Sequence, residues 1–106
     1  METNQGDDRW EALADGTRRA IVARLADGPL PVGQLAAGLP VSRSAVSQHL
    51  KVLKDAGLVE DSAAGTRRIY RLNPVALAAL RDQLDTYWRR ALAGYAEAVE
   101  TTGEEA

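Results

Sequence analysis

The stretch over residues 41–58, VSRSAVSQHLKVLKDAGL, constrains most strongly how this chain can fold. Its spacing predicts one amphipathic helix, because residues three or four apart share a helix face. Ser42 suits an N-cap and Gly57 suits a left-handed residue after the last turn, so we expect a helix over residues 42–56. The apolar face then contains Ala45, Val46, Leu50, Val52, Leu53 and Ala56. The polar face contains Arg43, Ser44, Ser47, Gln48, Lys51 and Lys54.

The polar face has an unusual chemistry, since no acidic residue lies between Arg43 and Lys54. A plain solvated face is one reading, although such faces commonly mix glutamate with lysine. Short hydroxyl side chains and a glutamine can approach base edges, and arginine or lysine suits guanine or phosphate. The face therefore also fits a contact with DNA.

Composition limits what else the chain can do. A length of 106 residues predicts one small domain, which would gain from dimerisation because its core is limited. Cysteine is absent, which excludes disulfides, thiolate metal sites and cysteine nucleophiles. We expect no membrane span and no signal peptide, and therefore a cytoplasmic protein.

The charge distribution is more informative than the net charge of −2. Residues 41–71 contain six cations and three anions, which leaves a charge of −5 for the remainder of the chain. A local basic surface on an acidic body can meet phosphates and still limit indiscriminate binding.

Three shorter helices should precede the central one. We expect the first over residues 7–14, with Trp10 and Leu13 on its apolar edge, and a second that starts at Asp15-Gly16-Thr17 and ends at residues 27–29. Residues 30–39 are predicted to form the third, and a short turn over residues 38–41 follows. Two short helices joined by such a turn fit the helix-turn-helix pattern.

A β-hairpin is expected next. Residues 58–62 and 66–72 are rich in strand-forming side chains on either side of Ala63-Ala64-Gly65. One reading is an edge hairpin with solvated arginines. The other is a wing, over residues 58–72, whose Arg67 and Arg68 reach phosphates beside the groove that holds the helix.

The last helix should start at Asn73-Pro74 and cover residues 74–100. Its apolar stripe is too long for so small a domain to cover. We expect its first part to lie in the core and its later part to form a two-fold dimer contact together with the first helix. The expected interface contains Trp10, Leu84, Tyr87, Trp88, Leu92, Tyr95 and Val99.

Three segments together resemble the ArsR/SmtB family of winged helix-turn-helix repressors. They are ALADGTRRAIVARLADGPLPVGQLA, VSRSAVSQHLKVLKDAGLVE and GTRRIYRLNP, and the resemblance covers about residues 9–77. It implies a mainly α fold with five helices and a small β-hairpin as a two-stranded wing. It also implies a homodimer formed by the first and last helices, and binding to a double-stranded DNA operator that a signal relieves.

The resemblance also carries individual roles. The DNA-reading positions of the family fall on Ser42, Arg43, Ser44, Ser47, Gln48 and Lys51, and the wing loop falls on residues 63–68. His49 matches a histidine of the family motif, so it joins the candidate DNA-binding residues. It also borders the apolar face, which leaves a packing role equally open.

Metal-sensing members of the family place cysteine pairs before the turn, or histidine and carboxylates along the last helix. Here the corresponding helix reads VGQLAAGL, and the last helix has no histidine. Its acidic residues offer only oxygen ligands, which do not suit soft or borderline metals. We therefore expect no metal and no cofactor. If a signal acts, we expect an apolar small molecule near Trp10, Tyr87, Trp88 and Tyr95, or a partner protein.

Three classes of function compete. The leading one is a homodimeric repressor that binds an inverted-repeat operator through the helix over residues 42–56 and the wing. The alternative is a winged-helix protein-interaction module without DNA binding, which predicts acidic or apolar residues on the polar face. An enzyme is disfavoured, because the chain has one histidine, no glycine-rich phosphate loop and no carboxylate cluster at a plausible cleft.

Overall fold

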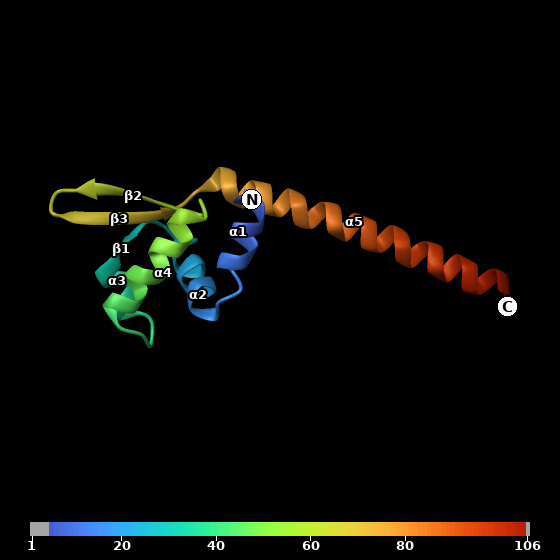
Figure 1. Cartoon of the computed structure of the whole chain (residues 1–106), viewed down its shortest axis with the longest axis horizontal. Helices are drawn as coiled ribbons and strands as arrows, with labels where there is room; N and C mark the ends of the chain where they lie inside the picture. Colours follow the sequence, from blue (N-terminus) through green and yellow to red (C-terminus); the bar gives the residue numbers. More distant parts are fainter. Residues whose placement is uncertain (1–4, 106) are drawn as a thin grey trace, which may run out of the picture.

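The structure is a computed structural model that describes the backbone of residues 5–105 and the side chains of residues 8–100. The elements follow the order α1 (Gln5–Ala12), α2 (Gly16–Leu25), β1 (Leu30–Pro31), α3 (Val32–Ala37), α4 (Arg43–Asp55), β2 (Val59–Ala64), β3 (Arg67–Leu72) and α5 (Pro74–Glu105). Figure 1 shows α1 to α4 gathered in one body, with the β2–β3 hairpin extending to one side and α5 to the other. The longest dimension is 68 Å.

The core is built around the apolar face of α4. Val46, Leu50 and Leu53 are buried there, together with Ile21 of α2 and Leu35 of α3. The remaining core residues come from α1, the end of α2, the α4–β2 segment and the start of α5, and they are Ala12, Leu25, Ala56, Leu58, Val59, Ala76 and Leu80. The predicted apolar face of α4 is therefore the buried one.

Val52 is the exception to that prediction, since 41% of it is exposed. It lines an open depression together with Asp8, Glu11 and Asp55. These polar side chains stay hydrated and do not close over it, so an apolar residue at the edge of the predicted face remains in contact with solvent.

Both ends of α4 have the predicted caps. The Ser42 hydroxyl accepts a hydrogen bond from the Ala45 amide at 3.1 Å. At the other end Gly57 has a φ of 82°, its amide donates to Lys54 O at 2.9 Å, and the Leu58 amide donates to Leu53 O at 3.0 Å. This pair of bonds is a Schellman motif, which needs a left-handed residue at the position of Gly57.

The first two helices differ from the predicted bounds by one or two residues. The first was expected over residues 7–14, but α1 starts at Gln5 and ends at Ala12, because Leu13 and Ala14 form the turn that leaves it. Asp15 caps α2 as predicted, since its carboxylate accepts a hydrogen bond from the Arg18 amide at 3.0 Å. That backbone hydrogen bond holds the pKa of Asp15 below its ordinary value.

The prediction of a helix over residues 30–39 is wrong at its start. Leu30 and Pro31 form the strand β1, which pairs antiparallel with Tyr70 and Ile69 of β3. Pro31 has an extended backbone, with φ −74° and ψ 158°, and α3 begins only at Val32. A proline lacks the N–H of an inner strand but is tolerated at an edge. The sheet therefore has three strands in the order β1-β3-β2, and not two.

The hairpin turn is tighter than predicted. The strand β2 includes Ala63 and Ala64, and Ala64 pairs directly with Arg67. Only Gly65 and Thr66 connect the strands, and Gly65 has a φ of 65°. Two-residue hairpin loops favour this positive φ, which glycine adopts without strain.

The last helix begins as predicted and ends later. The Asn73 side chain accepts hydrogen bonds from the amides of Val75 and Ala76, and Pro74 is the first helical residue. We expected an end at residue 100, but α5 reaches Glu105, since no proline stops its propagation. Among the described residues, no helix is both long and apolar enough to cross a membrane.

A pair of neighbouring substitutions tests this placement of α4. Leu53→Ala should lower the free energy of unfolding by about 2–5 kcal/mol, because it leaves a cavity in the core. Val52→Ala, one residue away and partly exposed, should cost less than about 1 kcal/mol. Urea denaturation measures both, and equal losses would contradict the assigned orientation of the helix.

Candidate nucleic-acid interface

The helix-turn-helix consists of α3, the turn over residues 38–42 and α4. Since one side of α4 is buried, its other side faces solvent along its full length. The N-cap Ser42 is exposed, and so are all the predicted polar-face residues, namely Arg43, Ser44, Ser47, Gln48, Lys51 and Lys54. The structure thus brings the predicted helix residues together on one accessible surface.

The cations of α4 differ in their surroundings. Arg43 makes no ion pair with any residue in the described part of the chain. Lys51 pairs with Asp55 one turn further along the helix, at 2.9 Å, and both side chains are well exposed. Such exposed pairs contribute little energy. Lys51 can therefore exchange this partner for a phosphate at small cost.

The two wing arginines also differ, although both were predicted to reach phosphates. Arg67 pairs in register with Ala64 and Arg68 with Ala63, so their side chains leave opposite faces of the hairpin. Arg68 binds the Asp61 carboxylate at 3.2 Å, whereas Arg67 has no ion pair with a described residue. Arg67 is the less constrained cation of the hairpin tip.

A cavity of about 420 Å³ lies between the hairpin and the helix-turn-helix. Arg43 contributes to it from the start of α4, and Arg67 and Arg68 contribute from β3. Its other lining residues are Pro31, Val32, Gly33, Thr66 and Tyr70. Arginine residues from α4 and from β3 therefore line one concave surface, and arginine suits the binding of phosphate oxygens.

His49 lies against α2, on the border between the two faces of α4. It is half-buried, and its Nδ1 atom is 3.4 Å from Nη1 of Arg18. Arg18 itself is held in place, since its Nε donates to the Ala12 carbonyl at 2.6 Å. Because a guanidinium can only donate, this contact requires an unprotonated Nδ1 in His49.

Some residues of this surface were not singled out from the sequence. Thr66 and Tyr70 line the cavity, and Asp61 binds both Lys54 and Arg68. Thr66 lies within the predicted wing loop, whereas Tyr70 and Asp61 could have been found only from the hairpin register, which sets Asp61 opposite Tyr70 and diagonal to Arg68. The register in turn depended on a turn that was predicted one residue too long.

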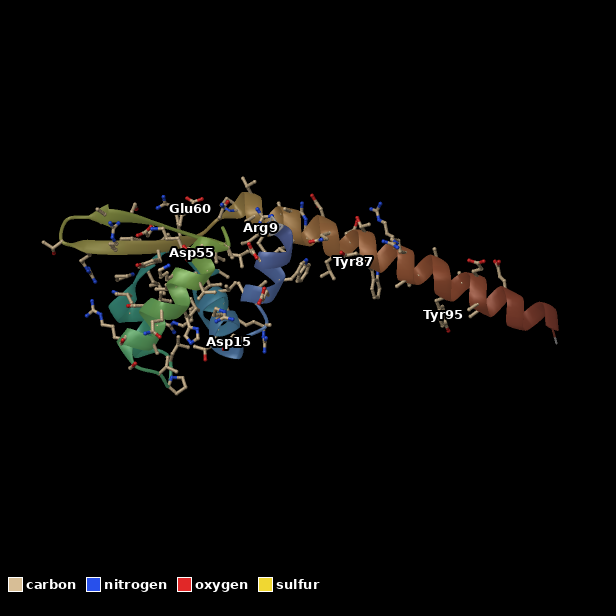
Figure 2. The ribbon with its side chains drawn as sticks, viewed as in Figure 1. Arg9, Asp15, Asp55, Glu60, Tyr87 and Tyr95 are labelled. Atoms are coloured by element: carbon tan, nitrogen blue, oxygen red, sulfur yellow. The ribbon has the colours of Figure 1, made fainter. Side chains whose placement is uncertain are left out.

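The residues expected at a dimer contact lie apart from this surface, along α1 and α5. Trp10 is half-buried, and its indole N–H donates to Oε1 of Gln83 at 2.6 Å. Figure 2 shows Tyr87 and Tyr95 on the part of α5 that extends away from the body. The large apolar side chains of that part are between 49% and 70% exposed, and they are Leu84, Tyr87, Trp88, Leu92, Tyr95 and Val99.

The side chains of the described residues contain no group of three or more histidine, cysteine, aspartate or glutamate residues that could hold a metal ion.

These features define a winged helix-turn-helix protein with a polar and basic face on the second helix of the motif. A family model of a helix-turn-helix domain matches residues 13–61. The HTH-type transcriptional regulator Rv2034 of Mycobacterium tuberculosis is 64% identical over 106 residues, which cover 99% of each chain.

Solved structures of transcriptional regulators are also similar to this chain. An ArsR-like transcriptional regulator from a Rhodococcus species has a TM-score of 0.71 and 32% identity, over 85% of this chain and 88% of that one. The homodimeric winged helix-turn-helix DNA-binding domain Mb0332 from Mycobacterium bovis has a TM-score of 0.67 and 32% identity, over 83% and 82% of the two chains. This chain belongs to the ArsR family of winged helix-turn-helix transcriptional regulators.

Substitution of Ser42 tests whether its side chain stabilises the N-terminus of α4, where the polar face begins. Ser42→Ala should lower the free energy of unfolding by about 1 kcal/mol, because the Ala45 amide loses its acceptor. The hydrogen exchange of that amide should become faster. Ser42→Asp keeps an acceptor and should retain most of the stability, so equal losses in the two variants would count against the cap.

Proposed function

We propose that this chain is a homodimeric repressor that binds an inverted-repeat DNA operator through α4 and the β2–β3 hairpin. The observation that carries the proposal is the continuity of the basic surface. It runs from the exposed face of α4, through the cavity with Arg43, to Arg67 at the hairpin tip. In such motifs the second helix enters the major groove and side chains near its N-terminus contact the bases.

The roles divide by chemistry along this surface. Ser44, Ser47 and Gln48 are short or planar polar side chains near the start of α4, and they suit base edges. Arg43, Arg67 and the lysines suit phosphates, which position the protein on the duplex. His49 is assigned to the packing of α4 on α2, because its ring contacts Arg18.

The proposed dimer uses α1 and α5. Trp10, Gln83 and Tyr87 form one chain of side-chain hydrogen bonds that joins the two helices, at 2.6 Å and 3.3 Å. Beyond it, the apolar face of α5 has no cover within the described part of the chain, and large exposed apolar patches of this kind mark interaction sites. A two-fold axis would pair this face with itself.

The contact of Trp10, Gln83 and Tyr87 between α1 and α5 is also where an effector could bind. An apolar small molecule or a partner protein that bound beside Trp10 and Tyr87 would touch both dimerisation helices at once. It would then change the distance between the two α4 helices, to which operator binding is sensitive. Tyr95 lies about two turns further along α5, so within one protomer it is the expected effector residue farthest from this contact.

A winged-helix module that binds proteins and not DNA has less support. Such a module would need acidic side chains or a broad apolar patch on the exposed face of α4. No acidic residue lies between Arg43 and Lys54, and Val52 at the edge of the face is the one large apolar side chain exposed there. Selection of duplexes from a random-sequence pool by the purified protein tests the proposal directly. We expect a consensus of two inverted half-sites about 10 bp apart or a near multiple. Recovery of unrelated sequences would contradict the proposal.

The dimer is tested on α5. Trp88→Asp should bury an unpaired carboxylate at the interface and weaken the dimer by more than about 2 kcal/mol. Arg89→Asp, on the adjacent residue, adds the same side chain where Arg89 is 79% exposed and paired with Asp85, and it should leave the dimer intact. Light scattering distinguishes these outcomes, and a monomeric wild-type protein at micromolar concentration would refute the dimer.

Base reading and phosphate contact are separated by two alanine substitutions. Gln48→Ala should change the preference at one base pair, by about 1–3 kcal/mol, as well as the affinity. Arg67→Ala should weaken all sequences alike and reduce the dependence of log K on log salt by about 0.9 for each lost phosphate contact. Arg89→Ala removes a positive charge that lies on α5, far from the proposed DNA-binding surface, and should leave the salt dependence unchanged. An unchanged slope in Arg67→Ala would exclude a phosphate contact.

A further inference from the structure

Asp61 on β2 differs from the other ion-paired carboxylates of the described residues. Its side chain is only 7% exposed, and it binds two cations at once. Its Oδ1 atom lies 2.8 Å from Lys54 Nζ, and its Oδ2 atom lies 3.2 Å from Arg68 Nη1. The carboxylates paired with Lys51, Arg71, Arg81 and Arg89 are between 45% and 74% exposed. A carboxylate withdrawn from water needs such partners to remain charged.

The two partners of Asp61 belong to different parts of the DNA-binding surface. Lys54 lies in the last turns of α4, and Arg68 lies on β3, diagonal to Asp61 on the same face of the hairpin. In the described part of the chain, no other polar side-chain contact joins α4 to the hairpin. The hydrogen bond from Lys54 also keeps the pKa of Asp61 below its ordinary value, so the carboxylate is ionised at neutral pH.

The contact does not use up the two cations. An ammonium group has three N–H donors and a guanidinium has five, and Asp61 takes one from each here. Lys54 remains 53% exposed and Arg68 remains 61% exposed, so both retain donors for phosphate. Without the carboxylate, two positive groups would stand beside each other and repel. The base of the hairpin would stay in the core through Leu58 and Val59, but its outer part would lose this polar link to α4.

We propose that Asp61 is a positioning residue for operator recognition, because it fixes the wing cation Arg68 relative to Lys54 of α4 through one shared carboxylate. Its negative charge reduces the general attraction to phosphates, and the fixed spacing favours DNA on which helix and wing fit together. Asp61 thereby increases the selectivity for the operator over other DNA. This inference rests on the proposed function.

The test uses Asp61→Asn, with Glu60→Gln as the matched control. Glu60 is the preceding residue on β2, and it pairs with Arg71 on the opposite face of the hairpin. Both variants remove one negative charge from the same strand, but only Asp61→Asn removes the link to α4. Fluorescence anisotropy measures the affinity of the 106-residue chain for a duplex selected from a random pool and for a scrambled duplex of equal length.

For Asp61→Asn we expect affinity for the scrambled duplex to rise about twofold, since one repulsive charge is lost at a distance of several ångströms in water. Affinity for the selected duplex should fall on the order of tenfold, because two charge-assisted contacts lose their alignment. Glu60→Gln should tighten both duplexes to a similar, small degree. Asp61→Glu, which keeps the charge, should recover part of the selectivity.

Three results would overturn the inference. If Asp61→Asn bound both duplexes more tightly, Asp61 would only compete with phosphate for the two cations. If it bound both more weakly and had a lower Tm, Asp61 would only stabilise the fold. An unchanged ratio of the two affinities would mean that Asp61 has no role in selectivity.

A measurement without DNA separates the inference about Asp61 from the proposed function. The ¹⁵N relaxation of residues 63–67 should show greater mobility in Asp61→Asn and not in Glu60→Gln. Unchanged mobility would also overturn the inference, whereas a wild-type protein without any preferred duplex would contradict the proposed function instead.

Discussion

The burial of one side of α4 is the interaction on which the rest of the structure depends. Val46, Leu50 and Leu53 are completely enclosed, and every other element of the body contributes residues to the core around them. Because one face of α4 is buried, only the side chains of the opposite face remain accessible for contact with DNA. The caps at Ser42 and Gly57 then fix where that surface begins and ends.

Two further surfaces follow from the same arrangement. The hairpin follows α4 directly through Leu58 and extends to one side of the body (Figure 1), and its tip residues Thr66 and Arg67 line one cavity with Arg43 of α4. The last helix leaves the core after Leu80, and the large apolar side chains from Leu84 to Val99 are exposed. The proposed surface for DNA and the proposed surface for a second protomer therefore lie on different sides of one small core. In the proposed dimer, an effector that bound at α1 and α5 would not touch the DNA. It would alter DNA binding by changing the distance between the two α4 helices.

The sequence predicted those features that depend on a few neighbouring residues. The caps of α4, the Asn73-Pro74 start of α5 and the buried face of α4 are examples, because helix periodicity and capping are local. Contacts between distant segments were missed. The strand at Leu30–Pro31 exists only because β3 lies beside it, and the two partners of Asp61 follow from a register that no local pattern specifies. Val52 was misplaced for the same reason, since its exposure depends on the side chains of α1.

The central claim is that the exposed face of α4 and the hairpin tip together bind DNA. NMR titration of the ¹⁵N-labelled protein with its selected duplex tests this claim most directly. We expect the largest amide shift changes over residues 42–51 and 63–68, with the side-chain amide of Gln48 shifting for the selected duplex and not for a scrambled one. Shift changes confined to α5, or the same changes with both duplexes, would contradict the account.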